Sequence, residues 1–292
     1  MDDSAKIYLG IALMIVMMGM GLSLTIGDFR RVVKFPKAVI IGLTNQMLLL
    51  PLIAILLIYA LDIRNTLAVG MIIIAACPGG PTSNLISHLC KGDTALSVTL
   101  TAFSSVLTLF TIPLFLEWSL NHFMGDDDTT IFLNRFDIFK DLFIITIIPI
   151  SFGMLIKRFK PKLADRLQGP VKVASALVLL VLIVGLTIKE KHNIIPYFSE
   201  VGIGTFLLNV STLALGYFTA KIFFLGKKQS ISISIESGIQ NGTLAIALAL
   251  GLLKNNDFAI PAAVYSLIMF VTSFVIIGFL NMKKSDSTRE HI

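Results

Sequence analysis

Charged residues are scarce in this sequence. Only 14% of its 292 residues are Asp, Glu, Lys or Arg, against roughly 25% in a soluble globular domain. Apolar residues make up 55% of the chain, and the mean hydropathy is +0.85. A soluble core of this length could not cover so much apolar surface, so lipid must surround most of the chain. The composition excludes a soluble protein and predicts an all-α integral membrane protein.

Cysteine is scarce as well, with Cys77 and Cys90 as the two examples. A helix between them would hold the two residues about 20 Å apart, which is too far for a disulfide bond. The first apolar run is not closed by a small-residue cleavage site, so we expect it to be retained as a span. The net charge of +6 comes from short loops between apolar runs. Such a pattern is typical of membrane topology and gives no reason to expect a nucleic-acid partner.

Apolar runs long enough to cross a bilayer occur nine times, which predicts one transmembrane domain over residues 1–292. The expected spans are roughly 5–26, 36–61, 65–90, 94–122, 138–156, 172–188, 201–224, 230–254 and 260–282. The loops on one side hold 17 of the 24 basic residues, and those on the other side hold 7. This bias predicts an N-terminus outside and a cytoplasmic C-terminus, and we expect the membrane to be a bacterial inner membrane.

Two of the expected spans contain helix-breaking residues at membrane depth. The third is interrupted near 77–82 by Cys-Pro-Gly-Gly-Pro-Thr, and the eighth near 237–242 by Ser-Gly-Ile-Gln-Asn-Gly. Proline removes a backbone donor and glycine weakens a helix, so both stretches should unwind. Unwound backbone is tolerated there only when it is buried in protein or lines a cavity. Antiparallel broken helices in the two halves of a chain are typical of an inverted-repeat secondary transporter, with its site where they cross.

Glu236 is the most informative single residue. It lies eight residues after Lys228, or about 12 Å along a helix, well inside the hydrocarbon. A carboxylate at that depth is expected to face the protein interior and to hold a cation or a proton. The polar residues near the two breaks carry oxygen donors, which suit a hard cation such as Na⁺: Ser83, Asn84, Ser97, Thr101, Gln240 and Asn241. Helix N-termini near Thr82 and Gly242 would favour an anion, so we expect an organic anion as the substrate.

The two breaks together resemble the bile acid:sodium symporter family. The segment from Ala76 to Asn84 is similar to that family's Cys-Pro-Gly-Gly-x-x-Ser-Asn motif. The segments Lys91-Gly92-Asp93, Glu236-x-Gly238-x-Gln240-Asn241 and Gly19-Met20-Gly21-Leu22 also fit the family pattern. The resemblance implies a core domain that carries both broken helices and a panel domain that moves against it. It also implies coupling to Na⁺, with two ions expected, rather than an enzymatic reaction.

The resemblance further implies positions for the ligands. One sodium site maps onto Ser83, Asn84, Ser97, Thr101 and Glu236. The second maps onto Gln46, Glu236, Gln240 and the backbone of Ser237 and Ile239. The expected substrate contacts are Pro81, Thr82, Asn241 and Phe270.

The sequence departs from the family in the expected substrate pocket. Pro81-Thr82 stands where the family usually has Thr-Ala, and Met269-Phe270 stands where some relatives carry His-Asn. The cation ligands are therefore retained while the pocket is altered, and the substrate is either steroid-like or a smaller carboxylate. Three alternatives remain open: a proton-coupled carrier, a thiol-dependent metalloid exporter that uses Cys77, and a receptor with a transporter fold. No obligate protein partner is evident.

Overall fold

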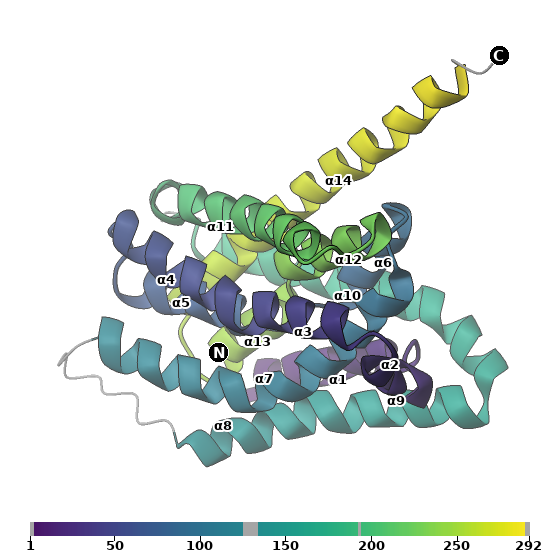
Figure 1. Cartoon of the computed structure of the whole chain (residues 1–292). Helices are drawn as coiled ribbons and strands as arrows, with labels where there is room; N and C mark the ends of the chain where they lie inside the picture. Colours follow the sequence, from purple (N-terminus) through teal and green to yellow (C-terminus); the bar gives the residue numbers. More distant parts are fainter. Residues whose placement is uncertain (1–2, 125–133, 192–193, 290–292) are drawn as a thin grey trace.

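The computed structural model describes residues 3–124, 134–191 and 194–289, and these residues are almost entirely helical (Figure 1). The helices in chain order are α1 (Asp3–Gly21), α2 (Ile26–Lys34), α3 (Pro36–Thr44), η1 (Asn45–Leu49), α4 (Leu50–Ala60), α5 (Asn65–Ala76), α6 (Pro81–Leu89), α7 (Thr94–Phe123), α8 (Arg135–Leu142), η2 (Phe143–Ile147), α9 (Ile148–Phe159), α10 (Pro161–Lys189), α11 (Ile194–Ile222), α12 (Lys227–Gly238), α13 (Gly242–Gly251), η3 (Asp257–Ala259) and α14 (Ile260–Arg289).

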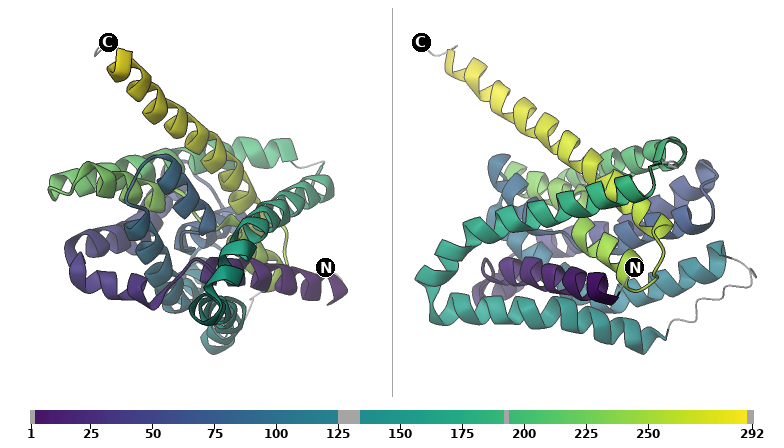
Figure 2. Two further views of the ribbon diagram at one scale, coloured as in Figure 1. Left: turned by 90° about the vertical axis from the view of Figure 1, so that its right-hand side faces the viewer. Right: turned by 180° about the vertical axis from the view of Figure 1, so that it is seen from behind.

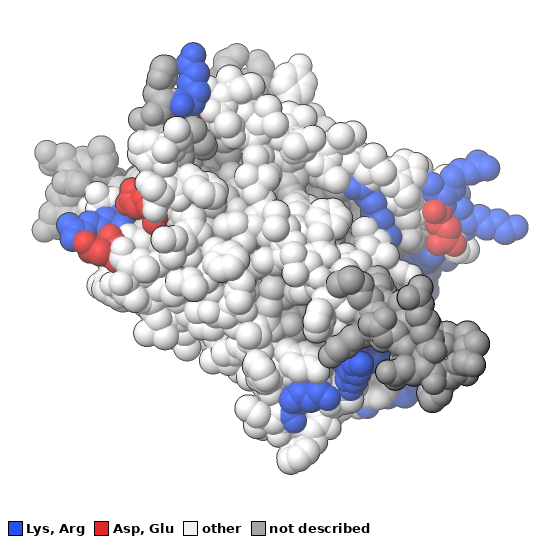
Figure 3. All heavy atoms as spheres, turned by 90° about the horizontal axis from the view of Figure 1, so that it is seen from above, with Lys and Arg blue, Asp and Glu red and all other residues white. Residues whose placement is uncertain are grey.

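Several helices are long and apolar enough to cross a bilayer. Within the described residues there are six, or seven when α1 and α2, which meet at an angle of 58°, are taken as one bent span. Two shorter apolar helices, α5 and α13, begin or end at the two breaks. Figure 3 shows that charged side chains gather near the margins of one face, with a wide uncharged area between them. This distribution is expected of a protein with a band of surrounding lipid.

One group of helices packs around α1. Figure 2 shows α1 alongside α9 and α10, and these three helices contact one another. Gly21 of α1 and Gly153 of α9 permit the close approach, because a Cβ atom on either would collide with backbone of the other helix. Small residues at helix crossings are the usual means of close packing in membranes. In the rest of the protein, α11 packs against α12 and α14, and α5 packs against α7 and α14. The two breaks begin at the ends of α5 and α12.

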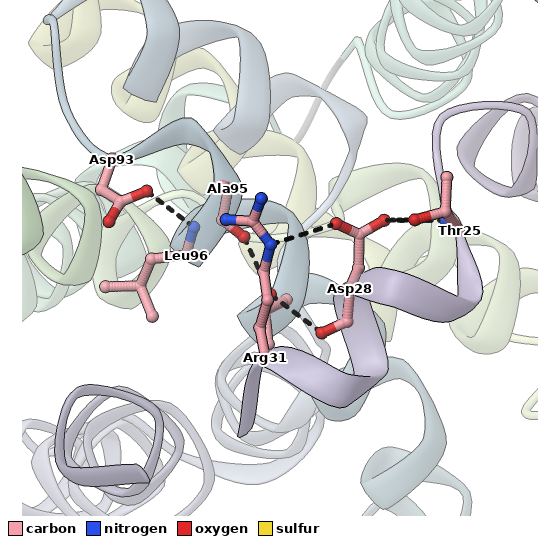
Figure 4. Close-up of polar contacts among 7 residues, drawn as sticks. Thr25, Asp28, Arg31, Asp93, Ala95 and Leu96 are labelled. Carbon is pink, nitrogen blue, oxygen red and sulfur yellow. Dashed lines mark hydrogen bonds and ion pairs between the residues drawn. The ribbon is translucent and has the colours of Figure 1, made fainter. Parts of the chain in front are cut away.

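Two side-chain caps fix the starts of α2 and α7 (Figure 4). The Asp28 carboxylate accepts hydrogen bonds from the backbone N–H and the hydroxyl of Thr25, at 2.8 and 2.7 Å. Asp93 Oδ1 accepts from the backbone N–H of Leu96 at 3.1 Å. Such caps satisfy N–H groups that have no partner within the helix. The Asp93 cap sets where α7 begins and so helps to set which α7 residues face the interior.

Two membrane helices contain a short π-helical segment. These segments are η1, between α3 and α4, and η2, between α8 and α9. Each is followed closely by a proline, Pro51 or Pro149, at the start of the next helix. Proline lacks the N–H that would continue the normal ladder, which accounts for the wider turn at this point. Such π segments frequently occur at functional sites, and η1 contains Gln46.

The two breaks lie against each other in the middle of the protein. Helix α5 ends at Ala76 and α6 begins at Pro81, while α12 ends at Gly238 and α13 begins at Gly242. The extended segments pair as an isolated antiparallel bridge between Gly79 and Gln240. The backbone N–H of Asn241 donates to the carbonyl of Pro78 at 2.9 Å. This pairing satisfies backbone groups that the breaks leave without helical partners.

Candidate functional site

The carboxylate of Glu236 lies at this crossing and is 1% exposed. It is within hydrogen-bonding distance of three hydroxyl groups on α6 and α7. Ser83 Oγ is 2.7 Å and Ser97 Oγ is 2.5 Å from Glu236 Oε1, and Thr101 Oγ1 is 2.9 Å from Glu236 Oε2. Ser97 and Thr101 can meet the same carboxylate because residues four apart lie on one face of a helix.

Asn84 joins the same cluster through its side-chain carbonyl. Asn84 Oδ1 lies 2.8 Å from Ser97 Oγ and 3.3 Å from Thr101 Oγ1. Its amide nitrogen, Nδ2, is buried and has no hydrogen-bond partner among the described residues. The structure therefore brings together all five residues of the first expected sodium site.

The carboxylate of Glu236 has no ion-pair partner among the described residues. The groups around it are neutral hydroxyls that can donate one proton each, and these protons are shared between the carboxylate and Asn84 Oδ1. A buried charge is costly unless it is paired. The unpaired carboxylate and the oxygens around it therefore indicate a place for a positive charge.

The residues expected at the second sodium site also lie around Glu236, but on its backbone side. Gln46 Nε2 is 3.2 Å from the carbonyl oxygen of Glu236. Gln240 Nε2 is 3.0 Å from the Ser237 carbonyl and 3.4 Å from that of Glu236. The side-chain oxygens of both glutamines are buried without a partner within the described residues. Ile239, the last of this set, is buried beside them.

These residues fit Na⁺ by their chemistry. Carboxylate, hydroxyl, amide and backbone carbonyl oxygens are the ligands of hard cations. By contrast, the described residues contain no group of three or more His, Cys, Asp or Glu side chains that could hold a metal ion. Cys77 is buried at the first break as a free thiol and has no second cysteine beside it.

Gly79 is a site residue that the sequence did not single out. A Cβ atom at this position would lie 2.5 Å from Glu236 Oε2, 3.2 Å from Ser83 Oγ and 3.3 Å from Gln46 Nε2. Only glycine leaves room for the carboxylate at this point. The neighbouring Gly80 is much less restricted, because its nearest contact would be at 3.7 Å, an ordinary van der Waals distance.

The expected substrate residues line a small pocket beside the crossing. Pro81, Thr82, Asn241 and Phe270 all contribute to it, and the space between them is about 20 Å³. Its remaining walls come from the two breaks and from α1, α10, α13 and α14: Gly80, Gln240, Val16, Ser175, Ala176, Leu179, Gly242, Thr243 and Met269. Asn241 Nδ2 is buried without a partner among the described residues. The N-termini of α6 and α13 both border the pocket, and its lining includes no Lys or Arg.

A larger cavity lies next to the small pocket, between α1 and α13. Its volume is about 210 Å³, and its walls are apolar except for Asp141. Leu13 and Ala247 line this cavity, whereas Val16 and Thr243, about one helical turn further along, line the small pocket. The two spaces therefore follow one another along one helix–helix contact.

The protein is largely apolar and helical, and its two broken helices meet at a buried carboxylate. This architecture is typical of a membrane transport protein. Comparison with known families makes this identification more particular. The model of the sodium bile acid symporter family matches residues 10–196, which is more than half of the chain, so the chain belongs to that family. The resemblance inferred from the sequence is confirmed.

Individual relatives match most of this chain. An uncharacterized sodium-dependent transporter, YocS, of Bacillus subtilis (strain 168) is 29% identical over 259 residues, covering 89% of this chain and 78% of the relative. The human ileal sodium/bile acid cotransporter is 27% identical over 277 residues, covering 93% and 78%. A probable sodium/metabolite cotransporter of rice chloroplasts, BASS2, is 29% identical over 249 residues. The alignment covers 85% of this chain but only 58% of the rice protein. The family and these relatives are named as transporters and not as enzymes.

Proposed function

We propose that this protein is a sodium-coupled symporter of a small or amphipathic organic anion. The observation that carries the proposal is the buried Glu236 carboxylate, which has no ion-pair partner among the described residues and lies among the oxygens of Ser83, Ser97, Thr101 and Asn84. A Na⁺ ion at this point would neutralise the carboxylate and would be coordinated by these oxygens. The names of the relatives agree with sodium coupling, since each one quoted above contains the word sodium.

A second Na⁺ ion is part of the proposal. The side-chain nitrogens of Gln46 and Gln240 lie next to the carbonyls of Glu236 and Ser237, and the oxygens of the same two amides have no partner among the described residues. These carbonyls belong to the last turn of α12, where the helix dipole is negative and favours a cation. Two positive charges would also favour the binding of an anion nearby, which couples the two solutes.

The proposed anion site is the small pocket beside the crossing. Two helix N-termini and the free N–H groups of Asn241 Nδ2 can bind a carboxylate without a basic side chain. The relatives are named for bile acid in one case and for a metabolite in another. In this chain Met269 and Phe270 make the far wall apolar, so the proposed substrate has an apolar part behind its carboxylate.

Alternating access is proposed as the mechanism. The helices around α1, α9 and α10 would act as the panel, and those that carry the breaks as the core. The cavity of about 210 Å³ lies between α1 of the panel and α13 of the core and extends toward the proposed anion site. This position is expected of a route by which the substrate reaches that site. We propose nine spans in total: the six long helices, the bent pair, and the two broken pairs α5–α6 and α12–α13. The proposed orientation has the N-terminus outside a bacterial inner membrane and the C-terminus in the cytoplasm.

A proton could in principle replace Na⁺ at Glu236, so the test must separate the two. We would measure the thermal stability of the purified protein in NaCl and in KCl at several pH values. The proposal predicts that NaCl raises Tm and KCl does not, because only a ligand of the folded state stabilises it. Glu236→Gln should remove the response to NaCl, since it removes the charge that the ion neutralises. A Tm that follows pH and is equal in the two salts would select the proton-coupled carrier.

A further inference from the structure

A second polar network contacts the end of α12 and includes neither Gln46 nor Gln240. It consists of Asn209 on α11 and Tyr265 and Thr272 on α14, and its centre is the carbonyl oxygen of Gly238. Asn209 Nδ2 donates to this oxygen at 2.7 Å, and the Tyr265 hydroxyl donates to it at 2.8 Å. Asn209 and Tyr265 are both 0% exposed. Nothing in the comparisons or in the family motifs quoted above assigns these residues a role.

Thr272 determines which way the Asn209 amide points. Its hydroxyl lies 2.7 Å from Asn209 Oδ1 and 3.1 Å from the carbonyls of Ile268 and Met269, so the shortest of its three contacts places a donor on this side of the amide. The amide nitrogen is thereby directed to the Gly238 carbonyl, and it also lies 3.4 Å from the Tyr265 hydroxyl. Each polar atom of the network has a partner, in contrast to the side-chain oxygens of Gln46 and Gln240, which have none among the described residues. A fully satisfied buried network of this kind is rigid.

The carbonyl groups at the end of α12 therefore differ in how they are held. The Glu236 and Ser237 carbonyls face the side-chain amides of Gln46 and Gln240, at 3.0 to 3.4 Å. Within the described residues, no donor fixes the oxygens of those two amides. The Gly238 carbonyl, by contrast, is bound at shorter distances by two donors from other helices.

Resting on the proposed sodium function, we propose that Asn209, Tyr265 and Thr272 are positioning residues for the second Na⁺ ion. They hold the Gly238 carbonyl away from the ion, and this fixes the direction of the neighbouring carbonyls that bind it. The same contacts tie the break to α11 and α14. These residues act through the backbone of α12 and do not touch the ion themselves.

The test compares Tyr265→Phe and Thr272→Val with the unmodified protein. Both changes keep the side-chain shape and remove one hydroxyl. We expect the NaCl concentration for half-maximal stabilisation to rise about tenfold in each variant, as for the loss of one buried hydrogen bond. The preference for Na⁺ over Li⁺, measured in the same way, should fall. Thr272→Ser should restore both values, because serine returns the hydroxyl that orients Asn209.

Two other buried hydroxyls serve as matched controls. Ser273 on α14 and Thr205 on α11 bond only to carbonyls of their own helices. Ser273→Ala and Thr205→Val should leave the half-maximal NaCl concentration and the Li⁺ preference unchanged, even where they lower Tm.

The possible results separate this inference from the proposed function. If the unmodified protein responds to NaCl, and Tyr265→Phe and Thr272→Val lower Tm without changing the half-maximal concentration or the ion preference, the residues are merely structural. The inference is then wrong and the symporter proposal stands. If the unmodified protein does not respond to NaCl at all, the proposed function fails, and the positioning role fails with it.

Discussion

Replacing Gly79 by alanine should disrupt the proposed sodium sites through a single methyl group. The added Cβ atom would lie 2.5 Å from Glu236 Oε2, whereas ordinary contacts begin at 3.4 Å. The carboxylate or the extended backbone must therefore move by about 0.9 Å to relieve the overlap. If the carboxylate moves, its contact with the Thr101 hydroxyl, now 2.9 Å from the same oxygen, is altered.

The size of the effect follows from the cost of overpacking. An extra methyl group in a close-packed interior costs ~1–3 kcal/mol when its neighbours cannot yield easily. Much of this strain would fall on the ion-binding geometry, since the neighbours in question are Glu236, Ser83 and Gln46. If Na⁺ binding carries the whole cost, its affinity falls by roughly 5- to 150-fold.

Gly80→Ala is the matched control, because its Cβ atom would meet nothing closer than 3.7 Å. The assay is the NaCl concentration that gives half of the maximal increase in Tm, measured for both variants beside the unmodified protein. Gly79→Ala should require a much higher concentration, and Gly80→Ala should resemble the unmodified protein. Equal values for the two alanine variants would refute the close packing of Gly79 on Glu236 as a requirement for binding.

Three further predictions address separate parts of the account. Ser97→Ala removes a hydroxyl 2.5 Å from Glu236, so the half-maximal NaCl concentration in the Tm assay should rise about tenfold. The Ser104 hydroxyl bonds, among the described residues, to its own helix, so Ser104→Ala should leave that concentration unchanged. Gly251 lines the larger cavity, and a Cβ atom there meets no neighbour. If this cavity opens to the outside, as the proposed orientation implies, Gly251→Cys in cells should react with a membrane-impermeant thiol reagent. Gly185→Cys, equally unhindered but outside the cavity, should not react, and the reverse pattern would contradict the proposed access route. Gly92→Ala would bring a Cβ atom to 2.6 Å from Ser232 Oγ and 2.8 Å from Ser87 Oγ, which form a 2.7 Å hydrogen bond. The Tm in KCl should therefore fall by several degrees. A Tm equal to that of the unmodified protein would show that the two serines can move aside at little cost.

The sequence indicates those parts of the site whose residues are unusual within an apolar membrane span. Prolines, glycines and a carboxylate stand out within apolar runs, and so Glu236 and the two breaks can be located from the order of residues alone. The i, i+4 spacing of Ser97 and Thr101 likewise places them on one face of a helix. The fold brings these groups together at the crossing.

Other features depend on contacts between helices that no local pattern describes. Gly79 and Gly80 are identical neighbours in the sequence, yet only Gly79 packs on the carboxylate. Asn209, Tyr265 and Thr272 lie in unbroken spans, where isolated polar residues usually satisfy themselves on their own helix. Asn209 and Tyr265 both donate to the Gly238 carbonyl, which is a backbone group and cannot be recognised as a partner from the sequence. The number of long apolar helices also differs from the expected number of spans, because a broken helix is too short to qualify by length alone.

The central claim is that the oxygens around Glu236 bind Na⁺. Equilibrium binding of ²²Na⁺ to the purified protein tests it most directly, with Glu236→Gln and an excess of unlabelled NaCl or KCl as comparisons. The account predicts saturable binding of two ions per chain that NaCl displaces and KCl does not, and its loss in Glu236→Gln. Absence of saturable binding in the unmodified protein, or undiminished binding in Glu236→Gln, would contradict it.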